Sequence, residues 1–380
     1  MKRMKRINIS IILFAFFFSC DTAFSIEIVS KNILYIEKKR EIWGRKIRWE
    51  NCPKIIPSRK IVDVTPYYGN KEMWKKTVKP YYKYAEIVSY LSDLYIISKP
   101  ANIKIAKCAL NWLDMWAVNL AMTAQSIVGN QSIYVRKWLS GSIAMSYFKL
   151  QNLKSLNHKK KKRIEKWISI LAELVADSAT GSSSARNNHA YWNGFTNMIN
   201  GIVLKRKDFI ETAVSQYKIA IDEMLVDGVL PLELARGKNS LHYHNFALEP
   251  LIFTAELGSR VGIDTYKIKS NLLFSDKILN IHTLTNLIIK TIQNPDYFKR
   301  YKEESLAVRK KGTISKFFND PDLSWMEIYF SRFKDKRLIP YLKRLRDFND
   351  FEKSRNRGLR NWRIGGNATL LWGTKILLPQ

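Results

Sequence analysis

The sequence predicts an all-α protein whose body forms one helical domain. Only 16 glycines and 11 prolines occur among the 380 residues, so long stretches run without a helix breaker. Within these stretches apolar residues recur at spacings of three and four, which is the period of an amphipathic helix. No Gly-, Ser- or Pro-rich linker divides the chain, and its length is sufficient for one large core. We therefore expect residues 76–380 to form a single domain.

The helical stretches are joined by short connections, which favours antiparallel helical hairpins. Lys99-Pro100 closes the first stretch, because proline rarely continues a helix. Asp208 is a candidate N-cap for the sixth stretch, and Asp227-Gly228 is expected to end it. The predicted helices cover residues 78–98, 102–125, 131–150, 160–178, 187–205, 207–226, 241–261, 276–292 and 325–346.

Residues 1–25 have the features of an export signal peptide. A basic segment from Lys2 to Arg6 precedes an apolar run, Ile11–Phe18, which is too short to span a bilayer. Ala23-Phe24-Ser25 then offers small residues for a signal peptidase. No later run approaches the roughly 20 apolar residues of a membrane helix. We therefore expect a periplasmic or secreted protein without stable membrane insertion.

A second interpretation of the N-terminus is a lipid anchor on Cys20. Phe18-Ser19-Cys20 would then be a poor lipobox. Phe17, rather than leucine, lies three residues before this cysteine, so plain cleavage is the better interpretation. Either route takes the mature protein out of the cytosol.

Residues 26–75 are expected to be irregular, since they contain several prolines and the cluster Tyr67-Tyr68-Gly69-Asn70. After the signal peptide only Cys52 and Cys108 remain. In an oxidising compartment the two thiols can form one disulfide, and two separate buried thiols are equally consistent with the composition. No Cys/His spacing indicates a zinc site.

The formal net charge is +31, from 64 Lys and Arg against 33 Asp and Glu. Such a field attracts polyanions, which include nucleic acid, acidic polysaccharide and anionic lipid. Export argues against nucleic acid as the partner. Part of the excess, such as Lys159 to Arg163, is explained equally well as a solvated helix start.

Three blocks between Arg186 and Leu248 concentrate amide, imidazole, guanidinium and phenol groups. They read Asn-Asn-His-x-Tyr-Trp, Leu-Pro-x-Glu-Leu-x-Arg and Tyr-His-Asn-x-Ala-Leu, and they occupy Asn187–Trp192, Leu230–Arg236 and Tyr243–Leu248. In this order and spacing they resemble the alginate lyase family of bacterial periplasmic polysaccharide lyases. Further matches to that family's pattern, from about residue 50 to about residue 370, are Cys108–Leu113, Arg136–Trp138, Gly141-Ser142 and Arg363–Gly366.

The resemblance implies an α/α toroid, an incomplete α/α barrel of helical hairpins with a cleft at one end. It also implies β-elimination on a polyuronate such as alginate, with mannuronate-rich polymer as the substrate. That chemistry removes the C5 proton beside a carboxylate, so the carboxylate must first be neutralised. Asn188, His189 and Arg236 match the family's positions for this task, and Tyr243 matches the position of the base and acid. No metal or organic cofactor is required by this reaction.

Simpler explanations exist for the same residues. A single histidine near aromatic residues is more often a hydrogen-bonded core residue, and Asn188 could simply cap the helix that follows it. His189 is also a rival for the role of base, because its ordinary pKa lies near neutrality. Tyr243 would need a nearby cation such as Arg236 to favour its phenolate. We expect His244, beside Tyr243, to be structural.

Aromatic and cationic residues are candidates for binding neighbouring sugars. Trp192 lies three positions after His189 and shares its helical face, so we expect it to stack on a sugar ring. Arg363 matches a family position that contacts a neighbouring uronate carboxylate, and the glycines after it allow a close approach of the backbone. Tyr68, Trp138 and Tyr147 are further candidates.

One departure from the family concerns its mobile N-terminal loop. The family carries a lysine before a Tyr-x-Gly pattern, whereas Pro66 stands at that place here. Lys60 or Lys71 could take the place of the family's loop lysine.

Taken together, the motifs predict a monomeric lyase for alginate. The alternatives are a lyase for another polyuronate and a non-catalytic polysaccharide binder derived from a lyase.

Overall fold

The computed structural model describes residues 72, 75, 78–97, 102–124, 130–153, 157–177, 186–271, 278–301, 321–345 and 359–373. The predicted signal peptide, the possible lipid anchor at Cys20, the Pro66 loop and Tyr68 lie outside these residues. None of the helices within this part combines the length and apolar character needed to cross a bilayer.

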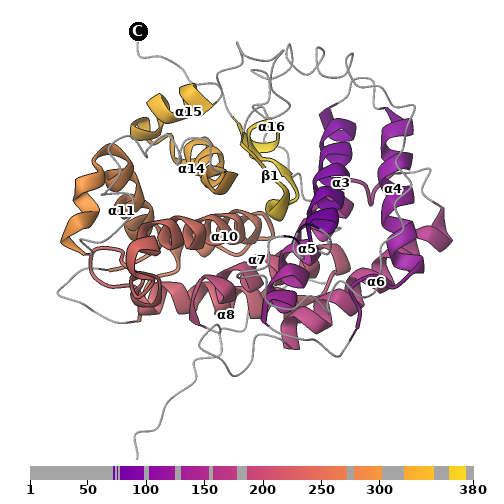
Figure 1. Cartoon of the computed structure of the whole chain (residues 1–380), viewed down its shortest axis with the longest axis horizontal. Coiled ribbons are helices and arrows are strands. Elements are labelled where there is room, and N and C mark those ends of the chain that lie inside the picture. Colours follow the sequence, from indigo (N-terminus) through magenta and orange to yellow (C-terminus); the bar gives the residue numbers. More distant parts are fainter. Residues whose placement is uncertain are drawn as a thin grey trace, which may run out of the picture.

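An inner ring of six helices forms the centre of the fold (Figure 1). Each helix of the ring packs against the next one along the chain, and the last packs back against the first. The ring therefore closes on itself. Its members are α3 (Lys79–Ile97), α5 (Asn130–Phe148), α7 (Asn188–Leu204), α10 (Ser240–Arg260), α14 (Trp325–Phe333) and α16 (Ala368–Trp372).

Outer helices cover the inner ring. The helix α4 packs on α3, α6 lies across α5 and α7, α8 lies across α7 and α10, and α11 packs on α10. This arrangement of inner and outer helices confirms the predicted α/α toroid. The outer helices are α4 (Ile103–Val118), α6 (His158–Asp177), α8 (Lys207–Glu223) and α11 (Ile281–Gln293).

Short elements complete the described part of the fold. Two two-residue strands, β1 (Arg360–Asn361) and β2 (Gly366–Asn367), pair antiparallel. Between them lies the 3-10 helix η9 (Trp362–Ile364). The remaining short helices are α9 (Pro231–Leu234), α15 (Ile339–Leu345), η4 (Gly237–Asn239), η5 (Thr265–Lys267), η6 (Pro295–Arg300), η7 (Pro321–Leu323) and η8 (Lys336–Leu338).

Three of the predicted helices differ from the observed ones. The stretch 102–125 ends already at Val118, and Leu120 and Met122 then adopt left-handed backbone conformations with φ of 47° and 61°. The stretch 276–292 begins only at Ile281, because Asn280 and Thr283 form a capping box in front of it. The stretch 325–346 is not one helix, since Lys334 adopts a left-handed backbone conformation with φ of 53° and ends α14. The chain then passes through η8 before α15 begins.

The predicted cap of α8 is also wrong. Arg206 occupies the N-cap position of α8 and makes no side-chain capping bond. Asp208 lies inside the first turn, where its carboxylate accepts a hydrogen bond from Arg206 at 2.7 Å. A carboxylate in the first turn still interacts favourably with the helix dipole. At the other end, α8 stops at Glu223, a turn before Asp227-Gly228.

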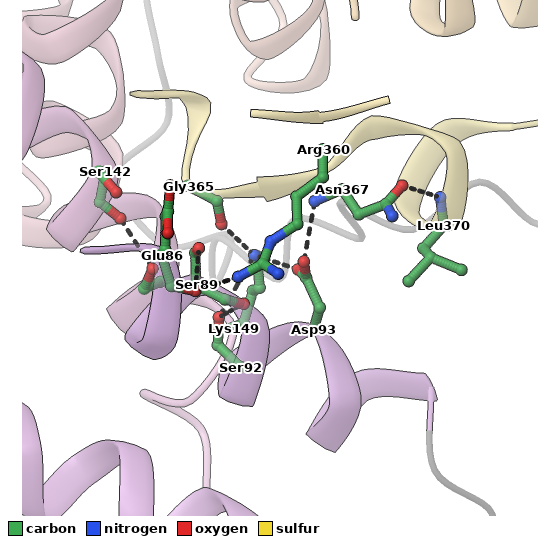
Figure 2. Close-up of polar contacts among 11 residues, drawn as sticks. Glu86, Ser89, Ser92, Asp93, Ser142, Lys149, Arg360, Gly365, Asn367 and Leu370 are labelled. Atoms are coloured by element: carbon green, nitrogen blue, oxygen red, sulfur yellow. Dashed lines mark hydrogen bonds and ion pairs between the residues drawn. The ribbon is translucent and has the colours of Figure 1, made fainter. Parts of the chain in front are cut away.

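A buried ion pair ties the β1–η9–β2 segment to the inner ring (Figure 2). Lys149, just after α5, donates to Asp93 of α3 and to the backbone carbonyl of Gly365, each at 2.5 Å. The second carboxylate oxygen of Asp93 accepts the backbone N–H of Asn367 at 2.8 Å. A Cβ at Gly366 would come within 2.6 Å of the Lys149 ammonium, so glycine is required there. These contacts hold in place the segment that carries Arg363.

Cys108 in α4 lies in a disulfide bond, so it is not a free thiol. The predicted partner, Cys52, lies outside the described residues. This bond disagrees with the alternative of two separate thiols.

Candidate active site

The site begins at the N-terminus of α7. Asn187 is the N-cap, and its side-chain oxygen accepts the backbone N–H of His189 at 3.0 Å. The simpler explanation that Asn188 caps this helix is therefore wrong. Asn188 is fully buried, and Glu233 holds it: the backbone N–H donates to Oε1 at 2.6 Å, and Nδ2 lies 3.0 Å from both carboxylate oxygens. Glu233 thus accepts a hydrogen bond from one of the backbone N–H groups that the N-terminus of α7 leaves without a partner inside the helix.

The connection from α9 to α10 supplies the guanidinium. Pro231 stands at the start of α9, where its missing N–H leaves no broken helix bond. Gly237, with φ of 56°, then turns the chain into α10. Arg236 lies in this turn, with Nε 3.7 Å from Oε2 of Glu233 and its side chain 34% exposed. Its guanidinium carbon is 4.9 Å from the centre of the Tyr243 ring. The structure therefore brings the predicted cation beside the predicted phenol.

Tyr243 lies in the first turns of α10 and is partly exposed. His244, its neighbour, points into the core: its Nε2 accepts the backbone N–H of Leu230 at 3.0 Å, and its Nδ1 lies 2.7 Å from the carbonyl of Ser240. A carbonyl only accepts, so Nδ1 carries the proton and the ring is neutral. Burial lowers the pKa of His244 to about 4. His244 is structural, as expected.

His189 is half-buried and stacks on Tyr134 of α5, with ring centres 3.6 Å apart and planes 11° apart. Burial, followed by the charges of Lys137 and Arg236, lowers its pKa to about 3. His189 is therefore neutral at physiological pH. A bound carboxylate would offset the two cations and favour protonation of this ring.

Lys137 of α5 contacts the backbone of His189. Its side-chain nitrogen donates to the backbone carbonyl of His189 at 2.9 Å, and the residue is 3% exposed. Burial lowers the pKa of Lys137 to about 7. Among the described residues no carboxylate pairs with it. The site therefore contains a buried amine that changes charge near neutrality.

Arg363 reaches the site from η9. Its Nη1 donates to Asp322 at 2.9 Å, and its guanidinium carbon lies 5.3 Å from the Phe246 ring and 5.4 Å from the Trp138 ring. Trp138 is partly exposed and also faces His189, at 6.5 Å between ring centres. Arg363 and Trp138 therefore lie together, and Trp138 lies beside His189.

Two predicted sugar-binding residues are instead part of the core. Trp192 is 0% exposed and packs against Phe195 and Phe246, with ring centres at 6.1 and 5.2 Å. Tyr147 is also 0% exposed, and its hydroxyl donates to Glu165 at 3.0 Å. Neither ring offers a face to a ligand. Other helices cover almost every side of α7 and the middle of α5. Trp192 is therefore buried although it shares a helical face with His189.

Buried polar atoms without a hydrogen-bond partner in the described part of the chain surround this site. They include Asn188 Oδ1, His189 Nδ1, Arg236 Nε, Arg363 Nε and Trp138 Nε1. Unpaired buried polar atoms are unfavourable, and in a native site they are commonly paired by ligand or water. Both donors and an acceptor are present, which suits a ligand that carries carboxylate and hydroxyl groups.

Three neighbours of the site were missed by sequence reasoning: Glu233, Lys137 and Tyr134. Glu233 stands three residues before Arg236 in the same block, so an i, i+3 pairing was a usable signal. Lys137 lies in the Arg136–Trp138 block, which was noted only as a match. Tyr134 carries no sequence signal, because its contact with His189 joins two helices that are far apart in the chain.

Comparisons with known proteins find similarity to one family of sequences. The family model described as alginate lyase matches residues 57–298. A polysaccharide lyase of Stenotrophomonas maltophilia strain K279a is 28% identical over 334 residues, which cover 84% of this chain and 90% of that protein. An alginate lyase of Cobetia marina is 28% identical over 271 residues, which cover 70% of this chain and 66% of that protein.

Solved structures share the fold. A histidine-to-alanine variant of alginate lyase A1-III complexed with a tetrasaccharide superposes with a TM-score of 0.66 at 25% sequence identity, covering 93% of this chain and 98% of that one. Alginate lyase A1-III from Sphingomonas species A1 has a TM-score of 0.66 at 24% identity, covering 91% and 98%.

Proposed function

Because this chain belongs to the alginate lyase family, we propose that it is a polysaccharide lyase that cleaves alginate by β-elimination. The observation that carries the proposal is the position of Arg236, with its guanidinium carbon 4.9 Å from the Tyr243 ring and its Nε 3.7 Å from the carboxylate that holds Asn188. Four groups suited to this reaction thereby gather from two helices and one turn.

The first task is neutralisation of the uronate carboxylate. Arg236 is partly exposed and offers a planar fork of donors for this anion. His189 stands beside it, neutral in the free enzyme, and the incoming carboxylate favours its protonation. These donors gain strength as negative charge moves onto the carboxylate when the C5 proton leaves. Asn188 adds an amide donor once it turns from Glu233.

Tyr243 is proposed as both base and acid. The adjacent guanidinium of Arg236 favours the phenolate, which takes the C5 proton. The electron pair of that C–H bond forms the C4–C5 double bond as the C4–O bond breaks. The phenol then returns its proton to the leaving oxygen, so one group serves both steps. The low pKa of His189 makes it a weak base and favours Tyr243 in this role.

Mannuronate units are the proposed substrate. In mannuronate the C5 proton and the C4 oxygen lie on the same side of the ring, as a single phenol requires. Arg363 is proposed to bind the carboxylate of a neighbouring uronate, with the Trp138 ring beside it at 5.4 Å. Another polyuronate with the same stereochemistry would satisfy the same groups.

The test is the growth of ultraviolet absorbance from unsaturated uronate ends, with polymannuronate, polyguluronate and other polyuronates supplied separately. We expect turnover on polymannuronate and its loss in Tyr243→Phe with binding retained. Tyr297→Phe, which removes a phenol far along the chain in η6, is the matched control and should keep full activity. Binding without turnover on any polymer would contradict the lyase and support the non-catalytic binder.

We also propose that the protein acts outside the cytosol, from the basic and apolar segments before residue 25 and the disulfide at Cys108. We propose that it acts as a monomer, because one chain supplies Asn188, His189, Arg236 and Tyr243. Fractionation of cells that produce the full chain, followed by sedimentation of the purified protein, tests both statements. Recovery from the cytosol or as a stable dimer would contradict them.

A further inference from the structure

Glu233 is a buried carboxylate in the site that takes no part in the proton transfers described above. It is 0% exposed. Its Oε1 accepts the backbone N–H of Asn188 at 2.6 Å, and both of its oxygens lie 3.0 Å from the side-chain nitrogen of the same residue. Its Oε2 lies 3.7 Å from Nε of Arg236. One carboxylate therefore touches two of the groups that are proposed to bind substrate.

The charged and titratable groups around Glu233 are few. From α7 it meets Asn188, which is neutral, and it acts electrostatically on Tyr191. From the turn after α9 it meets Arg236. Burial raises the pKa of Glu233, and the hydrogen bonds from Asn188 and the charge of Arg236 oppose this rise. A substrate carboxylate that pairs with Arg236 would offset the charge of Arg236, and the pKa of Glu233 would then rise further.

The protonation state of Glu233 decides which way the Asn188 amide points. An ionised carboxylate only accepts, so it requires the amide nitrogen to face it. Asn188 Oδ1 then faces away, buried and without a hydrogen-bond partner among the described residues. A protonated Glu233 would instead donate its O–H to Oδ1, and the amide nitrogen would turn toward the site. Only the second orientation gives the uronate carboxylate a donor.

We propose that Glu233 is a proton-linked positioning residue: ionised, it holds Asn188 and Arg236 in the free enzyme, and on substrate binding it takes one proton from solvent and turns the Asn188 amide toward the uronate carboxylate. This inference rests on the proposed function and names how the same site prepares its donors. It predicts that binding of an anionic oligosaccharide is coupled to proton uptake at Glu233.

The experiment measures proton uptake by titration calorimetry of a mannuronate oligosaccharide into the Tyr243→Phe protein, in buffers of different ionisation enthalpy. Glu233→Gln in this background should lower the uptake by up to about one proton. Binding should persist, because the Gln amide donates to Asn188 Oδ1 as the protonated acid would. Glu223→Gln, an acid-to-amide change on α8 that removes a partner of Arg186, is the matched control and should leave the uptake unchanged.

Lys137 and His189 are also expected to take up protons when the anionic oligosaccharide binds. Lys137→Met measures how much of the total proton uptake is due to the lysine. With Tyr243 intact, Glu233→Gln should keep turnover within about tenfold, whereas Glu233→Ala should lose more than a hundredfold. Unchanged uptake in a folded Glu233→Gln protein, or loss of turnover as severe as in Glu233→Ala, would overturn the proposal. Failure of the lyase itself is distinguishable, since it would appear as no turnover with Glu233 and Tyr243 both present.

Discussion

Lys137 donates from α5 to the backbone carbonyl of His189 at the start of α7, with 2.9 Å between the side-chain nitrogen and the oxygen. This contact places an amine with a pKa of about 7 directly beneath a histidine that is proposed to meet the substrate carboxylate. The contact between α5 and α7 therefore contains a buried amine whose charge changes across the physiological pH range.

The charge of Lys137 should make substrate affinity depend on pH. Below about pH 7 the amine is protonated and attracts the polyanion, and above it the attraction fades. Affinity of the Tyr243→Phe protein for mannuronate oligosaccharides should therefore fall as pH rises from 6 to 8. Lys137→Met should weaken binding at pH 6 by roughly tenfold, about 1.4 kcal/mol, and reduce this dependence to the part due to Glu233 and His189. Calorimetry checks both, with the exposed Lys166→Met as the control; an unchanged pH dependence would refute the prediction.

Arg363 should affect KM more than kcat. The pairing with Asp322 at 2.9 Å holds its guanidinium beside Trp138, where it is proposed to bind the carboxylate of a neighbouring uronate and not the uronate that is cleaved. Arg363→Ala should raise KM for polymannuronate roughly tenfold, equivalent to about 1.4 kcal/mol of binding, with little change in kcat. Steady-state kinetics measure the two constants, and Arg206→Ala, at the exposed turn between α7 and α8, serves for comparison. A large fall in kcat alone would place Arg363 in the chemical step instead.

His244 should make the fold sensitive to acid. Its pKa of about 4 in the folded protein lies below its ordinary value near 6.5, so the folded state keeps the ring neutral. As pH falls from about 6.5 toward 4, the unfolded state gains a proton on this ring that the folded state does not. The free energy of unfolding should therefore fall by about 3 kcal/mol over this range, whereas above about pH 6.5 the full stability is present. Urea unfolding of wild type, His244→Gln and the exposed control His158→Gln at pH 7 and pH 4.5 measures it. The His244→Gln protein should lose less stability between the two pH values than either of the others.

The Lys149–Asp93 pair should be strongly coupled. Replacing Lys149 by Met leaves the Asp93 carboxylate buried, and the loss is expected to be about 3–5 kcal/mol in the free energy of unfolding. Asp93→Asn in the same protein removes that charge and retains an acceptor for the backbone N–H of Asn367. The double variant should therefore be more stable than Lys149→Met alone. Denaturant unfolding of the four proteins completes the cycle, and additive effects would show that the two groups act independently.

Much of the fold was predictable from the sequence, because helical periodicity and the scarcity of glycine and proline are local properties. The stretches 78–98, 131–150 and 187–205 match α3, α5 and α7 to within a few residues. The breaks at Asn280 and Lys334 were missed, since a capping box and a left-handed lysine interrupt patterns that otherwise continue. The two-residue strands β1 and β2 are too short to leave a period.

The sequence by itself determined the candidate chemistry of the site: the amide, imidazole, guanidinium and phenol of Asn188, His189, Arg236 and Tyr243 are fixed in order along two helices and a turn. Only the tertiary structure decided which groups surround them. Trp192 shares a helical face with His189 yet is sealed in the core, whereas Lys137 and Tyr134 come to the same histidine from another helix. The reason is physical: local periodicity fixes where a side chain points from its own helix, and the packing of neighbouring helices fixes whether it meets solvent, a partner or nothing.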